Sequence, residues 1–316
     1  MTAIYLTEHD VAALADMNLA LDAVEEAFRQ LAEGGAENQP RRRVRAQGIV
    51  LHSMSAAAGY LGCVGWKQYT TTKQGAKFLV GLYGADTGQL TALIEADRLG
   101  RLRTGAATGV AAKFLAAQDA AQMGLIGTGR QAETQLAAVA AVRPLQRALV
   151  FSRDETRRQE FAAKMSQRLN VEVVAAESAQ AAVAQMPIVV TATTSRTPVL
   201  QAEWLSDSAL VCAVGSNALN RLEVDAETVR LATNIVCDDV EACRLEAAEL
   251  VAAAKSGAFQ WDTAIALADI VAGNYILPPG GVTLFKSVGL AIQDVALGCR
   301  IVQLATAAKA GSPLPF

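Results

Sequence analysis

The sequence predicts an α/β protein that combines a doubly wound parallel sheet with a second, α+β unit. An apolar run at 123–126 leads directly into Gly127-Thr128-Gly129 and an alanine-rich helical stretch, and strand and helix patterns alternate from there on. Apolar residues make up 52% of the 316 residues and aromatic residues only 5%. This composition is typical of helices packed on a parallel sheet.

The first hundred residues carry the pattern of an α+β unit. Helices are expected at 18–31, where apolar residues share one face, and at 99–117, a stretch dense in small residues. Several antiparallel strands are expected as well, at 4–6, 49–54, 60–69, 78–83 and 90–95.

Four arginines lie between positions 41 and 45, in an extended segment after Pro40. In a strand, Arg41, Arg43 and Arg45 would share one side while Arg42 points to the other. The segment is either a solvated charge run or the source of an arginine that points into a cleft.

From residue 122 onward, strands alternate with helices, which predicts the doubly wound sheet. Two later helices are expected at 240–256 and 283–308. We expect two domains, 1–112 with 290–316 and 113–289. Further strands are expected at 148–151, 171–175, 188–191, 209–214 and 234–237.

The glycine turn after the first of these strands predicts a Rossmann dinucleotide site, since a strand, a glycine turn and a helix start bind a pyrophosphate. Gly127 would allow the tight turn, and Gly129 would let the backbone approach the phosphates. Two further strands end in polar residues at the carboxyl edge, where ligands bind. The expected cofactor contacts are Gly127, Thr128, Gly129, Arg130, Gln131, Thr191, Ala192, Thr193, Val214, Gly215 and Ser216.

The end of the second strand indicates which dinucleotide binds. NAD enzymes carry an acid there for the adenosine ribose, but this chain has Ser152 followed by Arg153 and Arg157. A hydroxyl and two cations suit a 2′-phosphate, so NADP(H) is preferred and NAD(H) remains possible. Asp154 is either a helix cap or a competing ribose ligand.

Charge and composition argue against a nucleic-acid-binding protein, a membrane protein and a metalloprotein. The net charge of −3 gives no global attraction to nucleic acid or to anionic lipid. No apolar run is long enough for a membrane span, and the first residues lack the pattern of a signal peptide, so we expect a cytoplasmic protein. The five cysteines are scattered and there are only two histidines, so a metal site is not expected.

Two basic residues stand out as candidates for chemistry. Lys67 lies in an apolar, aromatic strand between Trp66 and Tyr69, where it either snorkels at an edge or serves catalysis. Arg103 begins a run of small residues that leaves room for a carboxylate or phosphate ligand, although a solvated arginine is the alternative.

Taken together in this order, these motifs resemble the ornithine cyclodeaminase and mu-crystallin family from end to end. The resemblance rests on Gln39-Pro40 with Arg42, Met54-Ser55-Ala56, Gly65 with Lys67, Asp86-Thr87-Gly88, Arg103-Thr104-Gly105-Ala106-Ala107, Gly127-Thr128-Gly129 with Gln131-Ala132, Gly215 with Glu223, and Thr283-Leu284-Phe285-Lys286-Ser287-Val288-Gly289 with Asp294.

The resemblance implies a homodimer in which a substrate domain supplies the dimer sheet beside a Rossmann domain. It implies that Arg42 and Arg103 hold the substrate carboxylate, that Lys67 lies near the reacting atoms and that Met54 lines the pocket. Asn217 stands where cyclodeaminases carry an aspartate, and we expect it to hydrogen-bond the substrate or the nicotinamide. The implied cofactor contacts further include Thr104, Lys286, Ser287, Val288 and Gly289.

The expected activity is NADPH-dependent reduction of a small cyclic ketimine carboxylate, such as pyrroline-2-carboxylate or piperideine-2-carboxylate. Ornithine cyclodeaminase or amino-acid dehydrogenase activity is the first alternative, although Asn217 cannot take the proton that an aspartate can. A non-catalytic protein that binds NADPH or a hormone, as the crystallins do, is the second.

Overall fold

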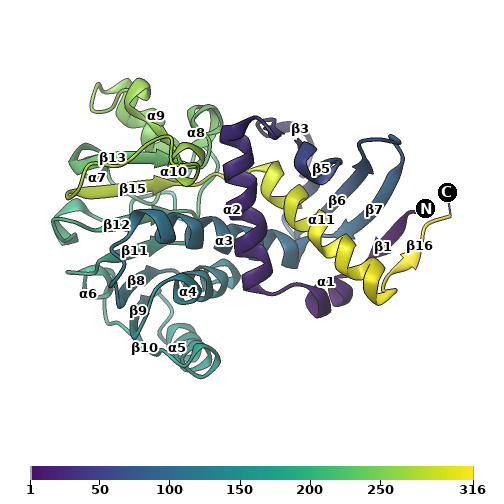
Figure 1. The fold of residues 1–316 in the computed structure, drawn as a ribbon. Coiled ribbons are helices and arrows are strands. Elements are labelled where there is room, and N and C mark those ends of the chain that lie inside the picture. Colours follow the sequence, from purple (N-terminus) through teal and green to yellow (C-terminus); the bar gives the residue numbers. More distant parts are fainter. Residues whose placement is uncertain (1, 316) are drawn as a thin grey trace. The chain divides into compact units, whose positions relative to one another are not determined.

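The computed structural model describes residues 2–315, which form two compact units (Figure 1). Unit 1 contains the residues up to Arg103 and those from Leu290 onward, and unit 2 is Thr104–Gly289. The boundary between the two units falls inside helix α3 (Asp97–Leu115), between Arg103 and Thr104. Close packing explains this position: a Cβ on Gly105 would lie 2.5 Å from the carbonyl oxygen of Thr134 in unit 2.

Unit 1 is a mostly antiparallel sheet covered by helices. The strand order is β16-β1-β7-β6-β5-β4-β2, and β3 also pairs with β4. Figure 1 shows α2 (Met17–Glu33) beside α11 (Ala291–Ala308), which packs on β4, β5 and β6. The other elements are α1 (Glu8–Leu14), β1 (Ile4–Leu6), β2 (Ala36–Asn38), β3 (Arg42–Ala46), β4 (Ile49–Ala58), η1 (Gly59–Leu61), β5 (Cys63–Thr72), β6 (Gly75–Gly84), β7 (Leu90–Glu95) and β16 (Ser312–Pro313).

Glycines let α11 pack closely against this sheet. A Cβ on Gly65 would lie 3.0 Å from Cγ2 of Val295 and 2.8 Å from the backbone oxygen of Gly81. Side chains of β5 alternate, so Gly65 and Lys67 face the helix while Val64 and Trp66 face the other way. This alternation decides which side chains of β5 are buried.

Unit 2 is a parallel sheet with the order β10-β9-β8-β11-β12-β15-β13-β14. From β8 the chain builds outward first through β9 and β10, then through β11 and β12 on the opposite side. This is the doubly wound topology that the sequence predicts, and its switch point lies between β8 and β11. The strands are β8 (Gln122–Ile126), β9 (Arg147–Phe151), β10 (Glu172–Ala175), β11 (Ile188–Thr191), β12 (Leu210–Ala213), β13 (Ala232–Cys237), β14 (Ile265–Ala266) and β15 (Val282–Lys286).

The helices of unit 2 follow the strands as crossover connections. They are the rest of α3, α4 (Arg130–Val142), α5 (Glu155–Leu169), α6 (Ala179–Val183), α7 (Ala226–Leu231), α8 (Val240–Glu246), α9 (Ala248–Lys255) and α10 (Leu267–Val271), with short turns η2 (Ala202–Trp204) and η3 (Trp261–Thr263). No helix in the described part of the chain is long and apolar enough to cross a membrane.

Two helix predictions are wrong. The segment predicted as one helix at 283–308 contains a buried strand, β15, then a loop in which Gly289 has φ +81°, and only then helix α11. Hydrophobic burial on both sides explains the error, because a strand buried on both faces shows no alternation. The helix predicted at 240–256 is broken at Ala247, which has φ −85° and ψ 93°.

Candidate active site

Lys67 lies near the middle of β5, on the face that α11 covers. Only 2% of the residue is exposed, and its Nζ donates to Oδ1 of Asp294 at 2.6 Å. The ammonium also lies 5.5 Å from the ring centroid of Phe78. Met54, the expected pocket wall, is buried directly opposite Lys67 on β4. The strand lysine is therefore a buried, ion-paired residue and does not snorkel at an edge.

Arg103 joins the same buried cluster from helix α3. Its Nε donates to Oδ1 of Asp294 at 3.2 Å, and one terminal nitrogen donates to Oε1 of Gln293 at 3.1 Å. One carboxylate oxygen on the first turn of α11 therefore accepts from both basic side chains. Gly100 keeps this corner open, since a Cβ there would lie 3.0 Å from Nζ of Lys67.

The arginine that joins this cluster from the N-terminal side is Arg41. Arg42, expected to hold the substrate carboxylate, is exposed and lies opposite Ser53 in the β3–β4 register. Its neighbour Arg41 is only 6% exposed, and its positive charge acts on Lys67. The buried arginine is therefore Arg41, which lies just before β3, and not Arg42, the first residue of that strand.

Burial and neighbouring cations change the acidity of Lys67. Burial, then the charges of Arg103 and Arg41, lower its pKa to about 8, while the carboxylate of Asp294 opposes that shift. An ammonium with such a pKa stays mostly protonated at neutral pH but gives up its proton more readily than an ordinary lysine. Lys67 therefore suits general acid catalysis.

In unit 2, the turn after β8 has the geometry of a phosphate-binding loop. Gly127 has φ +119°, and a Cβ there would lie 2.5 Å from the carbonyl oxygen of Ala192 in the loop after β11. Gly129 is the N-cap residue of α4 and provides no side-chain cap, and a Cβ on it would meet nothing within 4 Å. The helix start is thus shaped to accept an anion, as a pyrophosphate requires.

The end of β9 carries no free carboxylate. Oγ1 of Thr128 lies 2.9 Å from Oγ of Ser152, while Asp154 caps α5 by accepting from the backbone N–H of Arg157 at 3.0 Å. Arg153 and Arg157 are exposed. Arg158, which the sequence analysis did not single out, lies over the Phe151 ring at 5.5 Å and donates to the backbone oxygen of Ser152. The first acidic residue after β9 is therefore used as a helix cap.

A buried glutamate ties together two of the expected cofactor loops. Glu223 accepts from the backbone N–H of Thr193 at 2.6 Å, from its hydroxyl at 2.8 Å, and from the N–H of Gly215 at 2.6 Å. Burial raises the pKa of this carboxyl, while the nearby Lys286 lowers it. Lys286 itself is buried, 3.3 Å from Glu249 and 2.9 Å from the backbone oxygen of Ser216.

The loop after β15 is held in a similar way by Asp238. One oxygen of this buried carboxylate accepts from the hydroxyl of Ser287 at 2.7 Å and from the N–H groups of Val288 and Gly289 at 2.9 and 2.7 Å. These residues were expected to contact the cofactor. Their donors point at Asp238, which holds the loop in shape.

The other expected residues lie where their strands predict. Thr191 is buried at the end of β11, with Ala192 next to it and bonded to the backbone oxygen of Ile126. Val214 and the half-buried Asn217 lie in the loop after β12. The remaining expected cofactor residues are Thr104, half-buried in α3, and Arg130 and Gln131, exposed in the first turn of α4.

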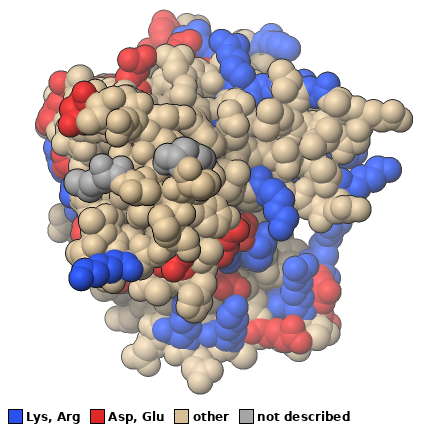
Figure 2. Space-filling model, turned by 90° about the vertical axis from the view of Figure 1, so that its right-hand side faces the viewer, with Lys and Arg blue, Asp and Glu red and all other residues tan. Residues whose placement is uncertain are grey.

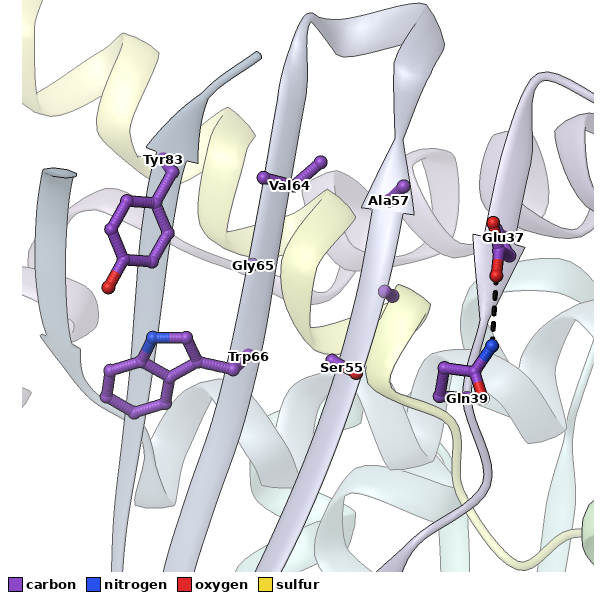
Figure 3. Close-up of a pocket in the computed structure, with 9 residues that line it drawn as sticks. Glu37, Gln39, Ser55, Ala57, Val64, Gly65, Trp66 and Tyr83 are labelled. Carbon is purple, nitrogen blue, oxygen red and sulfur yellow. Dashed lines mark hydrogen bonds between the residues drawn. The ribbon is translucent and has the colours of Figure 1, made fainter. Parts of the chain in front are cut away.

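A separate pocket of about 350 Å³ opens on the other face of the unit 1 sheet. Figure 3 shows the rings of Trp66 and Tyr83 next to one another, with Val64 and Ser55 nearby and α11 behind the strands. Trp66 lies against Gly81, where a Cβ would come within 2.3 Å of the indole. This pocket is therefore distinct from the Lys67 cluster, which faces the helix.

Charged side chains of both signs are mixed on the surface that Figure 2 shows. Blue and red groups lie close to one another at its lower right, and no continuous basic stripe crosses this face. The basic groups that matter for the candidate chemistry, Lys67 and Arg103, are buried.

Comparison with known proteins identifies the family. The model of the ornithine cyclodeaminase/mu-crystallin family matches residues 1–308. The chain belongs to this family. An alanine dehydrogenase from Archaeoglobus fulgidus is 32% identical over 100% of this chain and 99% of its own.

Solved structures of family members agree with the fold. A Δ1-pyrroline-2-carboxylate reductase from Thermococcus litoralis, in complex with NADH and L-proline, is 31% identical with a TM-score of 0.94, over 98% of this chain and 100% of that one. An archaeal alanine dehydrogenase dimer with bound NAD is 30% identical with a TM-score of 0.92, over 100% of both chains. The predicted enzyme class, an NAD(P)-dependent oxidoreductase of this family, and the Rossmann fold are confirmed.

Several buried acids have roles that local sequence patterns do not predict. Asp294 and Glu223 belong to the motifs of the family resemblance, whereas Asp238 and Glu249 belong to none of the predicted site motifs. A carboxylate directly after a buried strand, as Asp238 follows β13, was the available signal. Charges are almost never fully buried without partners, so such acids mark sites where loops or basic groups are held.

Proposed function

We propose that this protein reduces the C=N bond of a small cyclic imino acid, such as pyrroline-2-carboxylate or piperideine-2-carboxylate. The observation that supports it best is the buried pair of Lys67 and Arg103 on one carboxylate oxygen of Asp294, with the charge of the buried Arg41 acting on Lys67. Such a group suits a substrate that carries a carboxylate next to a basic nitrogen. The reductase from Thermococcus litoralis, which binds L-proline, is consistent with this substrate class.

The basic residues of unit 1 would then have different roles in binding and protonating the substrate. The two guanidinium groups of Arg41 and Arg103 would bind the carboxylate through charge-assisted hydrogen bonds and so fix the position of the imine carbon. Lys67 would donate a proton from Nζ to the imine nitrogen, which makes the carbon a better hydride acceptor. A bound nicotinamide supplies the hydride.

The residues of unit 2 fit a dinucleotide. Gly127 and Gly129 shape the turn, and the N-terminus of α4 provides N–H groups and a favourable dipole for the pyrophosphate. Glu223 and Asp238 would keep the loops after β11, β12 and β15 in the shape that the cofactor needs. Asn217, in the loop after β12, would hydrogen-bond the nicotinamide or the substrate.

We further propose a preference for NADPH over NADH. Ser152 replaces the acid that would bind a ribose hydroxyl, and Arg153, Arg157 and Arg158 lie within the next six residues. Asp154 is occupied as a helix cap, which removes it as a competing ribose ligand. Related structures hold NADH or NAD, so the preference has to be measured.

Exchanging Ser152→Asp tests this preference. The new carboxylate should repel a 2′-phosphate and bind a ribose diol, so the ratio of kcat/KM for NADPH to that for NADH should fall by on the order of tenfold or more. An unchanged ratio would refute the argument. Arg168→Ala, a change of an exposed arginine at the far end of α5, is the matched control and should leave the ratio alone.

We also propose that the protein is a homodimer formed through the open face of the unit 1 sheet. Val64 and Leu79 are exposed there, and the pocket of Figure 3 lies between Trp66, Tyr83 and β2. Exposed apolar surface of this kind marks interaction sites. The alanine dehydrogenase relative forms a dimer.

The central experiment is a substrate panel with both nicotinamides. Pyrroline-2-carboxylate, piperideine-2-carboxylate, pyruvate with ammonia, and L-ornithine would each be incubated with enzyme while nicotinamide oxidation or reduction is followed. We expect the cyclic imines to turn over fastest and Lys67→Ala to lose about 100-fold or more in kcat. Binding of NADPH without any turnover would instead indicate a non-catalytic binding protein.

Alanine dehydrogenase activity is the second candidate, because the alanine dehydrogenase relative matches over the whole chain at 32% identity. Faster turnover of pyruvate with ammonia than of the cyclic imines would favour it. Cyclodeaminase activity is disfavoured by the amide of Asn217, and release of proline and ammonia from L-ornithine would reverse that view.

A further inference from the structure

We propose that Asp294 is a positioning residue that keeps Lys67 charged as a proton donor and aligns Arg103 beside it. The inference rests on the proposed imine reduction. It assigns to helix α11 a role in setting the state of the catalytic lysine, in addition to covering the sheet.

The contacts of Asp294 are unusual for a buried acid. Its side chain is fully buried, yet a single oxygen, Oδ1, accepts from both Lys67 and Arg103 at 2.6 and 3.2 Å. The second oxygen, Oδ2, is buried without a hydrogen-bond partner among the described residues. An acceptor left in that condition costs stability, so folding alone does not account for an acid at this position.

The charge balance around Lys67 depends on this one group. Asp294 faces it from α11, Arg103 from α3 and Arg41 from the segment before β3. Met54 on β4 and Phe78 on β6 also lie next to Lys67, and neither carries a charge. Lys67 and Arg103 therefore share one carboxylate oxygen in a buried region, and the charge of Arg41 acts on Lys67 as well.

Gln293, the preceding residue, supports the same arrangement. Its Oε1 accepts from Arg103 at 3.1 Å and from the backbone N–H of Leu290 at 3.4 Å. The first turn of α11 thus binds the guanidinium of Arg103 through one neutral and one charged acceptor. This leaves the orientation of Arg103 fixed before any substrate binds, which is what a preorganised site requires.

Removing the charge of Asp294 should lower the pKa of Lys67. Burial and the two arginines would remain, whereas the opposing carboxylate would be lost. Because the present value is about 8, a decrease by about one unit or more leaves at least half of Lys67 neutral at neutral pH, and a neutral amine is too weak an acid to protonate the imine.

The direct test is titration of Lys67 by NMR in protein made with isotope-labelled lysine. The signal is assigned by its loss in Lys67→Arg. In Asp294→Asn, which keeps the shape of the side chain, the midpoint should fall by about one pH unit or more, a tenfold change in the equilibrium. An unchanged midpoint would overturn the proposal.

A matched control is Glu246→Gln on helix α8, another nearly fully buried acid, which lies in unit 2. It should leave the Lys67 midpoint where it is. If Asp294→Asn does not fold, Asp294→Glu provides the test. Because this variant keeps the carboxylate, the titration midpoint of Lys67 should stay within about half a pH unit of the wild-type value, while kcat falls. A midpoint that drops in Asp294→Glu as well would contradict the role of the charge.

Kinetics provide the second readout. For imine reduction, kcat should decrease as pH rises through the pKa of Lys67, and this limb should move to lower pH in Asp294→Asn. A uniform loss of kcat at every pH would mean a merely structural residue. If the wild-type protein reduces no imine but the NMR shift is observed, the proposed function fails while the role of Asp294 stands.

Discussion

At the scale of single residues, the candidate site depends on which of two adjacent arginines is buried. Arg41 and Arg42 are chemically identical neighbours, but one is 6% exposed and the other lies on the open side of the sheet. Only the charge of the first acts on Lys67. A shift of one position in a strand reverses the side to which the charge points.

This difference gives a paired prediction. Arg41→Ala should raise KM for the imino acid by roughly 10- to 150-fold, because a hydrogen bond to a charged group contributes about 1.5–3 kcal/mol. Arg42→Ala, the matched control, should change KM by less than about threefold. Steady-state kinetics at saturating nicotinamide measure both, and a larger effect of Arg42→Ala would restore that residue to the carboxylate site.

At the scale of elements, strand β8, its glycine turn and helix α4 form the unit that we propose binds the dinucleotide. Gly127 is needed for folding, since its φ of +119° and the carbonyl of Ala192 exclude a side chain. Gly129 differs, with φ −84° and open space around it. The folded protein alone therefore does not require glycine there.

We predict that Gly129→Ala separates folding from cofactor binding. The thermal midpoint without cofactor should change by no more than a degree or two, while the Kd for the dinucleotide should rise by on the order of tenfold, because the new methyl group occupies the approach of the pyrophosphate. Differential scanning calorimetry and titration calorimetry provide the two numbers. Gly127→Ala should instead destabilise the protein itself, and unchanged affinity in Gly129→Ala would show that the phosphates bind elsewhere.

At the scale of the whole molecule, the open sheet face of unit 1 bears on assembly. Val64 is 39% exposed beside Trp66 and Tyr83, on the side of the sheet away from α11. A two-fold dimer through this face would bring the same residues of two chains together. An apolar residue in such an interface does not tolerate a charge.

Val64→Glu should therefore convert a dimer into a monomer, since two carboxylates would be desolvated in the interface. Sedimentation velocity would then show particles with half the mass of the dimer. Leu245→Glu replaces an apolar residue that is 50% exposed on α8, and it should leave the mass unchanged. Retention of the dimer in Val64→Glu would mean that the chains associate through another surface.

The sequence by itself determined the nucleotide-binding half and the family. The evidence lies in local patterns: the glycine turn, the alternation of strands and helices, and the ordered motifs. Such patterns can be recognised in a sequence because each one reflects a single strand, turn or helix start. Lys67 and Arg103 were found in the same way, as charges in apolar or small-residue surroundings.

Only the tertiary structure decided which contacts hold the loops and the basic side chains of the candidate site in place. Asp294 lies 227 residues from Lys67 in the chain, and Glu223 reaches two loops that precede it. Strand β15 was misread as a helix because burial on both faces removes the periodicity that distinguishes the two. The burial of Arg41, next to an exposed Arg42, is a property of the folded chain. Contacts between distant segments depend on how the whole chain packs, and no single stretch of sequence contains that information.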